Sequence, residues 1–248
     1  MKLHILGSGT CIPDKDRGSS GYALVLKTKK ILLDCGNGTT WKLALKDINY
    51  LEIDYIFITH LHPDHTSDLI PFLFGTKYNT EQQRLKPLYL TGPPGFLDFF
   101  NSLKNTFNNW IDPEQLFVSE ISPGKYKFDD FILSCEYTSH TENSLAYGIV
   151  SEGKKLVYTG DTDYSEDLAG FAKDADLLLI ECSFPDNRKV KGHLTPSEVI
   201  RIMKLSGPGK TLLTHMYPVC DKADILKQIS ENTVLPVVIA EDMMEIGI

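Results

Sequence analysis

The feature that most constrains the fold is a pattern of hairpin, helix and strand that occurs twice along the chain. Residues 21–36 read as an apolar hairpin, and a buried strand is expected at 53–59 after an intervening helix. Residues 145–161 repeat the hairpin, and 175–181 repeat the strand. Short β-rich apolar runs bounded by turns are typical of strands packed on both faces. Unless the repeat is coincidental, the chain is an α/β protein with two mixed sheets, a four-layered αββα sandwich with internal duplication.

The remaining apolar segments add further strands and helices to this sandwich, and nothing in the sequence indicates a boundary between domains. Prolines and glycines punctuate turns throughout, but no low-complexity linker is present, so we expect a single domain over residues 1–248. The chain is expected to begin with a strand that runs into a glycine turn near Gly7. A mostly helical region is expected over 68–110, interrupted by a strand at Pro87–Leu90. The elements expected after it are a run of strands over 117–137, a helix at Ser197–Leu205 and a strand at Thr211–Thr214.

Composition excludes several classes of protein. The 248 residues contain no apolar run near the ~18 residues that a membrane helix needs. The first residues lack the apolar stretch of a signal peptide, so a cytoplasmic location is expected. The five cysteines are scattered singly, which predicts reduced thiols and no disulfide framework. A net charge of −8 disfavours a nucleic-acid binder, although it leaves room for a local basic patch.

The strongest chemical signal is the run Thr-His-Leu-His-Pro-Asp-His at residues 59–65. Three of the seven histidines in the chain, together with one aspartate, fall within six residues directly after an expected strand. Imidazole nitrogens and carboxylate oxygens suit Zn²⁺, Mn²⁺ or Fe²⁺. This density makes a polar loop of solvated histidines a poor alternative, so we interpret His60, His62, Asp64 and His65 as metal ligands.

Further ligands are expected where other strands end. His140, Asp161 and His215 each follow an apolar strand at once, in Thr-Ser-His-Thr, Thr-Gly-Asp-Thr and Leu-Thr-His-Met. Strands of one sandwich that end at the same edge would bring such residues together. Each residue alone also suits a capping or loop position. The shared placement favours a composite metal site.

These motifs resemble those of the metallo-β-lactamase superfamily, in which an HxHxDH motif, a later His, a Gly-Asp and a final His occur in this order. The resemblance extends over essentially the whole chain and implies the αββα sandwich inferred above. It also implies a two-metal site. In that arrangement one metal is held by His60, His62 and His140, a second by Asp64, His65 and His215, and Asp161 bridges the two.

Within the superfamily the chain is similar to the ribonuclease Z branch. Residues 6–20 resemble that family's glycine turn and its PxKxRN motif, with Lys15 and Arg17 at the basic positions. Asp34-Cys-Gly resembles its second strand ending, and the segment around Glu181 resembles its HEATF motif. The run Gly-His-Leu-Thr at 192–195 resembles its HxT segment, which makes His193 the counterpart of a catalytic histidine.

Three departures from that family bear on the substrate. Gly18 stands where the family has the asparagine of PxKxRN, and Ile180 stands where it has the histidine of HEATF. Only twenty residues separate His140 from Asp161, the interval that holds a flexible transfer-RNA-gripping arm in ribonuclease Z. Twenty residues hold little more than the expected hairpin, so the arm is absent.

The resemblance implies roles for residues beyond the ligands. Asp64 would bind metal and orient the hydroxide that attacks phosphorus, and His193 would donate a proton to the leaving alkoxide. Glu181 would either orient His193 or cap a strand end. Lys15 and Arg17 would either bind phosphate or lie in a solvated turn.

We therefore expect a hydrolase with two divalent ions per chain, most simply zinc, with manganese or iron as alternatives. The favoured reaction is metal-activated hydrolysis of a small or nucleotide-like phosphodiester. Alternatives are an armless ribonuclease Z that cuts RNA 3′ ends, a hydrolase of thioesters, lactones or sulfate esters, and a non-catalytic module with a relic site, which a complete ligand set disfavours. RNA is a less favoured partner than a small molecule, no membrane partner is expected, and a homodimer is a natural assembly.

Overall fold

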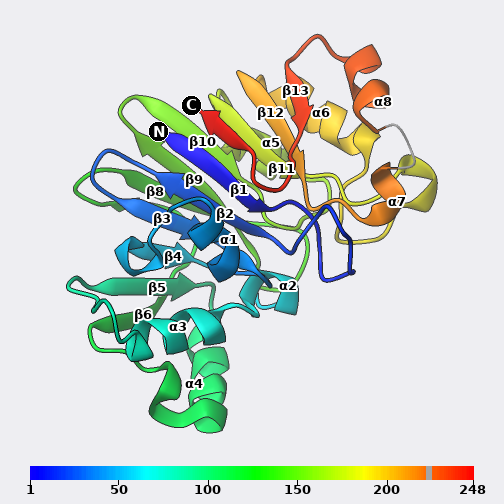
Figure 1. The fold of residues 1–248 in the computed structure, drawn as a ribbon. Helices are drawn as coiled ribbons and strands as arrows, with labels where there is room; N and C mark the ends of the chain where they lie inside the picture. Colours follow the sequence, from blue (N-terminus) through cyan, green and yellow to red (C-terminus); the bar gives the residue numbers. More distant parts are fainter. Residues whose placement is uncertain (222–224) are drawn as a thin grey trace.

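The computed structural model describes residues 1–221 and 225–248, and its strands form two seven-stranded sheets. The sheets lie face to face, and helices cover the two outer sides, so that the chain forms four layers (Figure 1). The two chain ends lie close together at the same end of the sandwich (Figure 1). The αββα sandwich that the sequence predicts is confirmed.

The first sheet is built mainly from the N-terminal half, in the order β14-β1-β2-β3-β4-β5-β6. Its strands are antiparallel from β14 to β3 and parallel from β3 to β6. They are β1 (Lys2–Gly7), β2 (Gly21–Val25), β3 (Lys30–Leu33), β4 (Tyr55–Phe57), β5 (Leu88–Gly92), β6 (Leu116–Glu120) and β14 (Glu245–Gly247).

The second sheet has the order β13-β12-β11-β10-β9-β8-β7. It is antiparallel from β7 to β10 and parallel from β10 to β13, so the two sheets follow one plan. Its strands are β7 (Gly124–Lys127), β8 (Ile132–Tyr137), β9 (Leu145–Ser151), β10 (Lys154–Tyr158), β11 (Leu177–Glu181), β12 (Lys210–Thr214) and β13 (Val237–Ile239).

Three apolar clusters hold the layers together. One lies between the sheets, and the other two lie between each sheet and its helices. Among the described residues, no helix combines the length and apolar character needed to cross a membrane. The helices are α1 (Thr39–Leu45), α2 (Pro63–Thr66), α3 (Leu69–Tyr78), α4 (Phe96–Phe107), α5 (Glu166–Phe171), α6 (Pro196–Ser206), α7 (Pro218–Asp221) and α8 (Ile225–Asn232), with 3-10 turns η1 (Tyr50–Glu52), η2 (Asn108–Ile111) and η3 (Asp186–Arg188).

The expected duplication is confirmed: β2-β3-α1-β4 and β9-β10-α5-β11 are each an antiparallel hairpin, a helix and a parallel strand. One strand is shorter than expected, since β4 ends at Phe57 and not at Thr59. The reason lies in the hydrogen bonds, because Thr59 donates its backbone N–H to the Asp34 carboxylate and not to a strand. The chain therefore leaves the sheet just before the histidine motif.

Candidate metal centre

The loop after β4 carries four of the expected ligands. Helix α2 begins at Pro63, since proline suits the first position of a helix, and its single turn holds Asp64 and His65. The turn packs against the end of β3, where the Cys35 N–H donates to the His65 carbonyl at 2.8 Å. Gly36 permits this approach, because a Cβ there would lie 2.1 Å from the Asp64 carbonyl oxygen.

The other three expected ligands follow strands of the second sheet. β8, β10 and β12 all run in the same direction, so their C-terminal ends lie at one edge of the sheet. His140, Asp161 and His215 follow these ends and meet the loop from the first sheet. His215 adopts the left-handed backbone region, with φ of 53°, a strained conformation that is concentrated at functional sites.

All seven expected ligand side chains come together in two adjacent groups. Asp161 faces both: Oδ1 lies 3.4 Å from His65 Nε2, and Oδ2 lies 3.3 Å from His215 Nε2. His140 Nε2 lies 3.2 Å from His62 Nδ1. The ligand atoms lie within 4.8 Å of one another in each group, which are His60, His62, His140 and Asp161, and Asp64, His65 and His215.

The residues fit divalent cations. His60 Nε2, His65 Nε2 and Asp161 Oδ1 are buried polar atoms that have no hydrogen-bond partner among the described residues, a costly state that a bound cation would relieve. Burial, and next the neighbouring His65, hold the pKa of His60 well below its usual value. Its imidazole is therefore neutral and has a lone pair free for a metal.

The imidazoles of His65 and His215 each contact a further polar side chain on the ring nitrogen that faces away from the centre. Asp34 Oδ2 lies 2.7 Å from His65 Nδ1 and accepts a hydrogen bond from the Tyr158 hydroxyl at 2.7 Å. Ser183 Oγ lies 3.0 Å from His215 Nδ1. Such partners fix the ring orientation of metal-binding histidines. Neither Asp34 nor Ser183 was predicted from the sequence to have this role, although Asp34 follows β3 directly and so shares the placement of the expected ligands.

His193, to which the resemblance gives a catalytic role, lies beside the expected ligands. Its Nδ1 is 3.1 Å from Glu181 Oε1 and 3.9 Å from Asp161 Oδ2. Asp161, His193 and His215 also form a third group with metal-binding spacing, which the sequence did not predict. The nitrogen that faces Asp161 is, however, already engaged by Glu181. Glu181 also accepts the backbone N–H of Thr162 at 2.7 Å, so it both contacts His193 and caps a loop.

The basic residues of the first loop have other partners. Arg17 donates to the Ser8 hydroxyl at 2.9 Å and to the Ala240 carbonyl at 2.7 Å, so it joins the N-terminal loop to the C-terminal segment. Lys15 extends into solvent with its ammonium 3.6 Å from the neighbouring Asp16. These contacts favour the structural turn over the phosphate-binding alternative.

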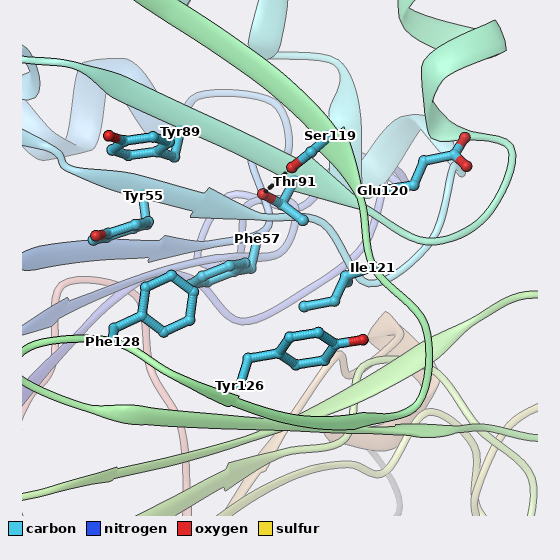
Figure 2. A pocket seen from close by; sticks show the side chains of 9 residues that line it. All are labelled: Tyr55, Phe57, Tyr89, Thr91, Ser119, Glu120, Ile121, Tyr126 and Phe128. Carbon is cyan, nitrogen blue, oxygen red and sulfur yellow. Dashed lines mark hydrogen bonds between the residues drawn. The ribbon is translucent and has the colours of Figure 1, made fainter.

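Two hollows differ in their chemistry. One of about 560 Å³ adjoins the ligand cluster and is bordered by His140, Asp163, Tyr164 and Lys191, among others. The other, of about 410 Å³, opens where β4 to β6 face β7, and aromatic rings form most of its wall (Figure 2). It contains no histidine, and Glu120 is its only charged side chain. Of these two hollows, only the one beside His140 adjoins the expected ligands.

Comparison with known proteins identifies one matching family model and several similar sequences. A family model described as anti-Pycsar protein Apyc1 matches residues 1–224. The chain is 28% identical to a ribonuclease Z from Brevibacillus brevis, over 88% of this chain and 86% of that protein. It is 27% identical to a probable metallo-hydrolase, YhfI, from Bacillus subtilis, over 87% of both proteins.

Solved structures show the same likeness. The crystal structure of the metallo-β-lactamase fold protein YhfI from Bacillus subtilis superimposes with a TM-score of 0.85, 25% identity and 99% coverage of both chains. Human short-form tRNase Z shares the fold, with a TM-score of 0.80 and 24% identity over 100% of this chain and 99% of that one. The resemblance to the metallo-β-lactamase superfamily and its ribonuclease Z branch is confirmed.

Proposed function

Since this chain belongs to the anti-Pycsar protein Apyc1 family, we propose that it is a dinuclear phosphodiesterase that hydrolyses a small or nucleotide-like phosphodiester. The chain is a metal-dependent hydrolase of the metallo-β-lactamase fold, like its named relatives. We further propose two divalent cations, zinc first, one held by His60, His62 and His140 and one by Asp64, His65 and His215, with Asp161 between them.

When bound, the cations supply Lewis acidity and lower the pKa of a water toward ~7. The protein adds a carboxylate at the same place. Burial alone would raise the pKa of Asp64, but its hydrogen bond with His215 lowers the pKa to about 2. Asp64 therefore stays ionised at neutral pH and serves as a hydrogen-bond acceptor that orients a water toward phosphorus.

The observation that carries the proposal is the placement of His193 next to the ligands with Glu181 as its partner. Burial lowers the pKa of His193, but the hydrogen bond to Glu181 and the Glu181 charge outweigh burial and raise the pKa overall. Its Nε2 makes no hydrogen bond to a described residue. A protonated imidazole here supplies what a diester requires, a proton for an alkoxide leaving group.

Three features support a small substrate. The hollow beside His140 holds about 560 Å³, within the range of pockets that bind small molecules. The hairpin of β9 and β10 takes up most of the interval between His140 and Asp161, which leaves no length for a gripping arm. The net charge of −8 also opposes the electrostatic attraction to phosphates that dominates RNA affinity.

A substrate panel tests the proposal. We expect bis(4-nitrophenyl) phosphate and a 3′,5′-cyclic mononucleotide, a diester contained within one nucleotide, to be hydrolysed faster than 4-nitrophenyl phosphate, a β-lactam and a precursor transfer RNA. Efficient cleavage of the transfer RNA at its 3′ trailer would instead make the chain an armless ribonuclease Z. Activity on a thioester or lactone alone would contradict the phosphodiesterase assignment and leave the metal site standing.

The role of His193 is tested separately. His193→Ala should lower turnover of the diester by ~10²–10⁴-fold, the usual cost of losing a proton donor, and leave the metal content unchanged. His4→Ala is the matched control, because His4 lies on β1 near Glu245, apart from the ligands. Loss of a metal from His193→Ala would make this residue a ligand and contradict its role as donor.

A further inference from the structure

Two aromatic side chains border the metal centre without belonging to a hydrophobic core. Phe184 follows β11 and Tyr217 follows β12, and their rings stack with centroids 4.5 Å apart and planes 26° apart. Both side chains are partly exposed. Neither is part of the three apolar clusters that hold the described layers together. The fold therefore presents this pair to solvent at the edge of the site.

The pair lies on the His193 side of the cluster. The Phe184 ring centre is 5.7 Å from that of His193, and the Tyr217 ring centre is 6.1 Å from His193 and 6.0 Å from His215. The hollow beside His140 lies next to a different ligand and contains neither ring. The aromatic pair therefore lies outside the lining of that hollow.

Backbone contacts fix the pair in place. The Phe184 N–H donates to the Leu194 carbonyl at 3.4 Å, which joins it to the segment that carries His193. The residue after His215, Met216, donates its N–H to the Ser8 carbonyl at 3.1 Å, and the Tyr217 carbonyl accepts from Cys220 at 2.8 Å. The strained backbone at His215 therefore directs both a ligand and an aromatic ring toward the centre.

From this geometry we propose that Phe184 and Tyr217 bind a planar aromatic group on the leaving-group side of the substrate. The inference rests on the proposed function, in which His193 donates to the leaving oxygen, so that the leaving group lies next to these rings. Phe184 carries no polar group and Tyr217 only a phenol, so the stacked pair offers an uncharged aromatic surface. A neutral aromatic surface favours stacking over capture of a charged group.

Two matched diesters test whether the aromatic pair, Phe184 and Tyr217, binds an aromatic leaving group. Methyl phenyl phosphate and methyl hexafluoroisopropyl phosphate have leaving alcohols of similar acidity, but only the first is aromatic. Replacing both rings in a Phe184→Leu, Tyr217→Leu double variant should lower kcat/KM for the phenyl ester by about ten- to a hundredfold, the usual range for loss of stacking. The fluoroalkyl ester should be nearly unaffected. Phe117→Leu, which removes a 53% exposed ring on β6, is the control that should change neither.

Binding without turnover gives a second readout. Calorimetry should show that the metal-loaded protein binds phenylphosphonate more tightly than methylphosphonate, and that Tyr217→Leu removes the preference while Tyr217→Phe keeps it. An unchanged ester ratio and an unchanged phosphonate preference in the double variant would overturn the inference, as would equal losses in Tyr217→Phe and Tyr217→Leu. If the wild-type protein hydrolyses no diester, the proposed function fails. Phosphonate binding still decides whether Phe184 and Tyr217 bind an aromatic group.

Discussion

Asp161 is the residue that joins the two proposed groups of metal ligands. Its two oxygens face different histidines, His65 and His215, across the centre. Asp161→Ala should therefore lower the occupancy of both cations, which elemental analysis of the purified variant measures as metal per chain. Asp176→Ala, which removes a carboxylate that pairs with Lys154 on the same sheet, should keep the wild-type content. A single tightly bound metal that persists in Asp161→Ala would contradict a dinuclear centre.

Asp34 contacts the proposed ligand His65 without belonging to the ligand groups, and we expect it to orient that imidazole. Asp34→Asn keeps the size of the side chain but weakens the acceptor that faces His65 Nδ1 at 2.7 Å. We expect metal affinity to fall by about 10- to 100-fold, as is usual when such a partner is lost, and competition with a chelator measures it. Asp54→Asn changes another buried carboxylate of this sheet, which pairs with Lys86, and should leave affinity intact. Equal losses in both variants would contradict the orienting role.

At the level of single residues, the sequence predicted which side chains would come together as expected metal ligands. It did not predict which neighbouring side chains contact and orient them. The rule that found Asp161 and His215 was local, since each lies within three residues of the end of an apolar strand. Ser183 also follows an apolar strand, two residues after the end of β11, but a serine there is no metal-ligand signal, and its contact with His215 forms only when β11 and β12 pair. Partners of that kind depend on tertiary structure, which motif spacing does not encode.

Among the elements, the segment between β11 and α6 is joined by Lys189 to the loop after β10 and to the start of α6. Lys189 donates to the His193 carbonyl at 2.5 Å and pairs with Asp163 and Glu198 at 2.6 Å each. Asp163 also accepts the Gly192 N–H at 2.9 Å. The Gly192 carbonyl lies 2.8 Å from His140 Nδ1. Lys189 therefore sets the position of two functional histidines through the backbone of one segment.

Lys189→Met should remove this clamp and keep the aliphatic length of the side chain. We expect kcat for the diester to fall by about ten- to a hundredfold, because small displacements of catalytic groups are costly. KM and metal content should change little. Steady-state kinetics measure both constants, and Lys189→Arg should restore part of kcat. Lys173→Met, at an exposed lysine beyond α5, is the control, and an equal fall in its kcat would contradict the clamp.

The elements themselves were predictable where the pattern was local. The two hairpins and the helix over 197–205 had clear turn and capping signals, and α6 has the Thr195–Glu198 capping box. Residues 79–86, expected within a mostly helical region, form neither helix nor strand. The strands β13 and β14 were not expected at all. Each has three residues and is defined by pairing with a distant partner, β12 or β1, which local periodicity cannot report.

For the whole molecule, the sequence predicted two layers of sheet but not how the chain ends close the fold. β14 completes the first sheet beside β1, and Asp242 precedes it. The Asp242 carboxylate accepts from the Ser8 N–H and the Gly18 N–H at 2.8 Å each and pairs with Lys42 at 2.5 Å. The C-terminal segment thereby fixes the loop whose Ser8 carbonyl supports the backbone beside His215.

Removing that carboxylate should therefore destabilise the fold as a whole. Asp242→Ala leaves two backbone N–H groups and a largely buried lysine without their acceptor, so we expect the free energy of unfolding to fall by about 2 to 4 kcal/mol. Urea unfolding at neutral pH measures it. Asp112→Ala is the matched control, because Asp112 pairs with Lys104 at the surface with 42% of its side chain exposed, and such a pair contributes less than about 1 kcal/mol. If the two variants lose equal stability, Asp242 is only another surface carboxylate. If Asp242→Ala loses more, closure of the sandwich by its C-terminal segment supports both the fold and the loop beside the metal centre.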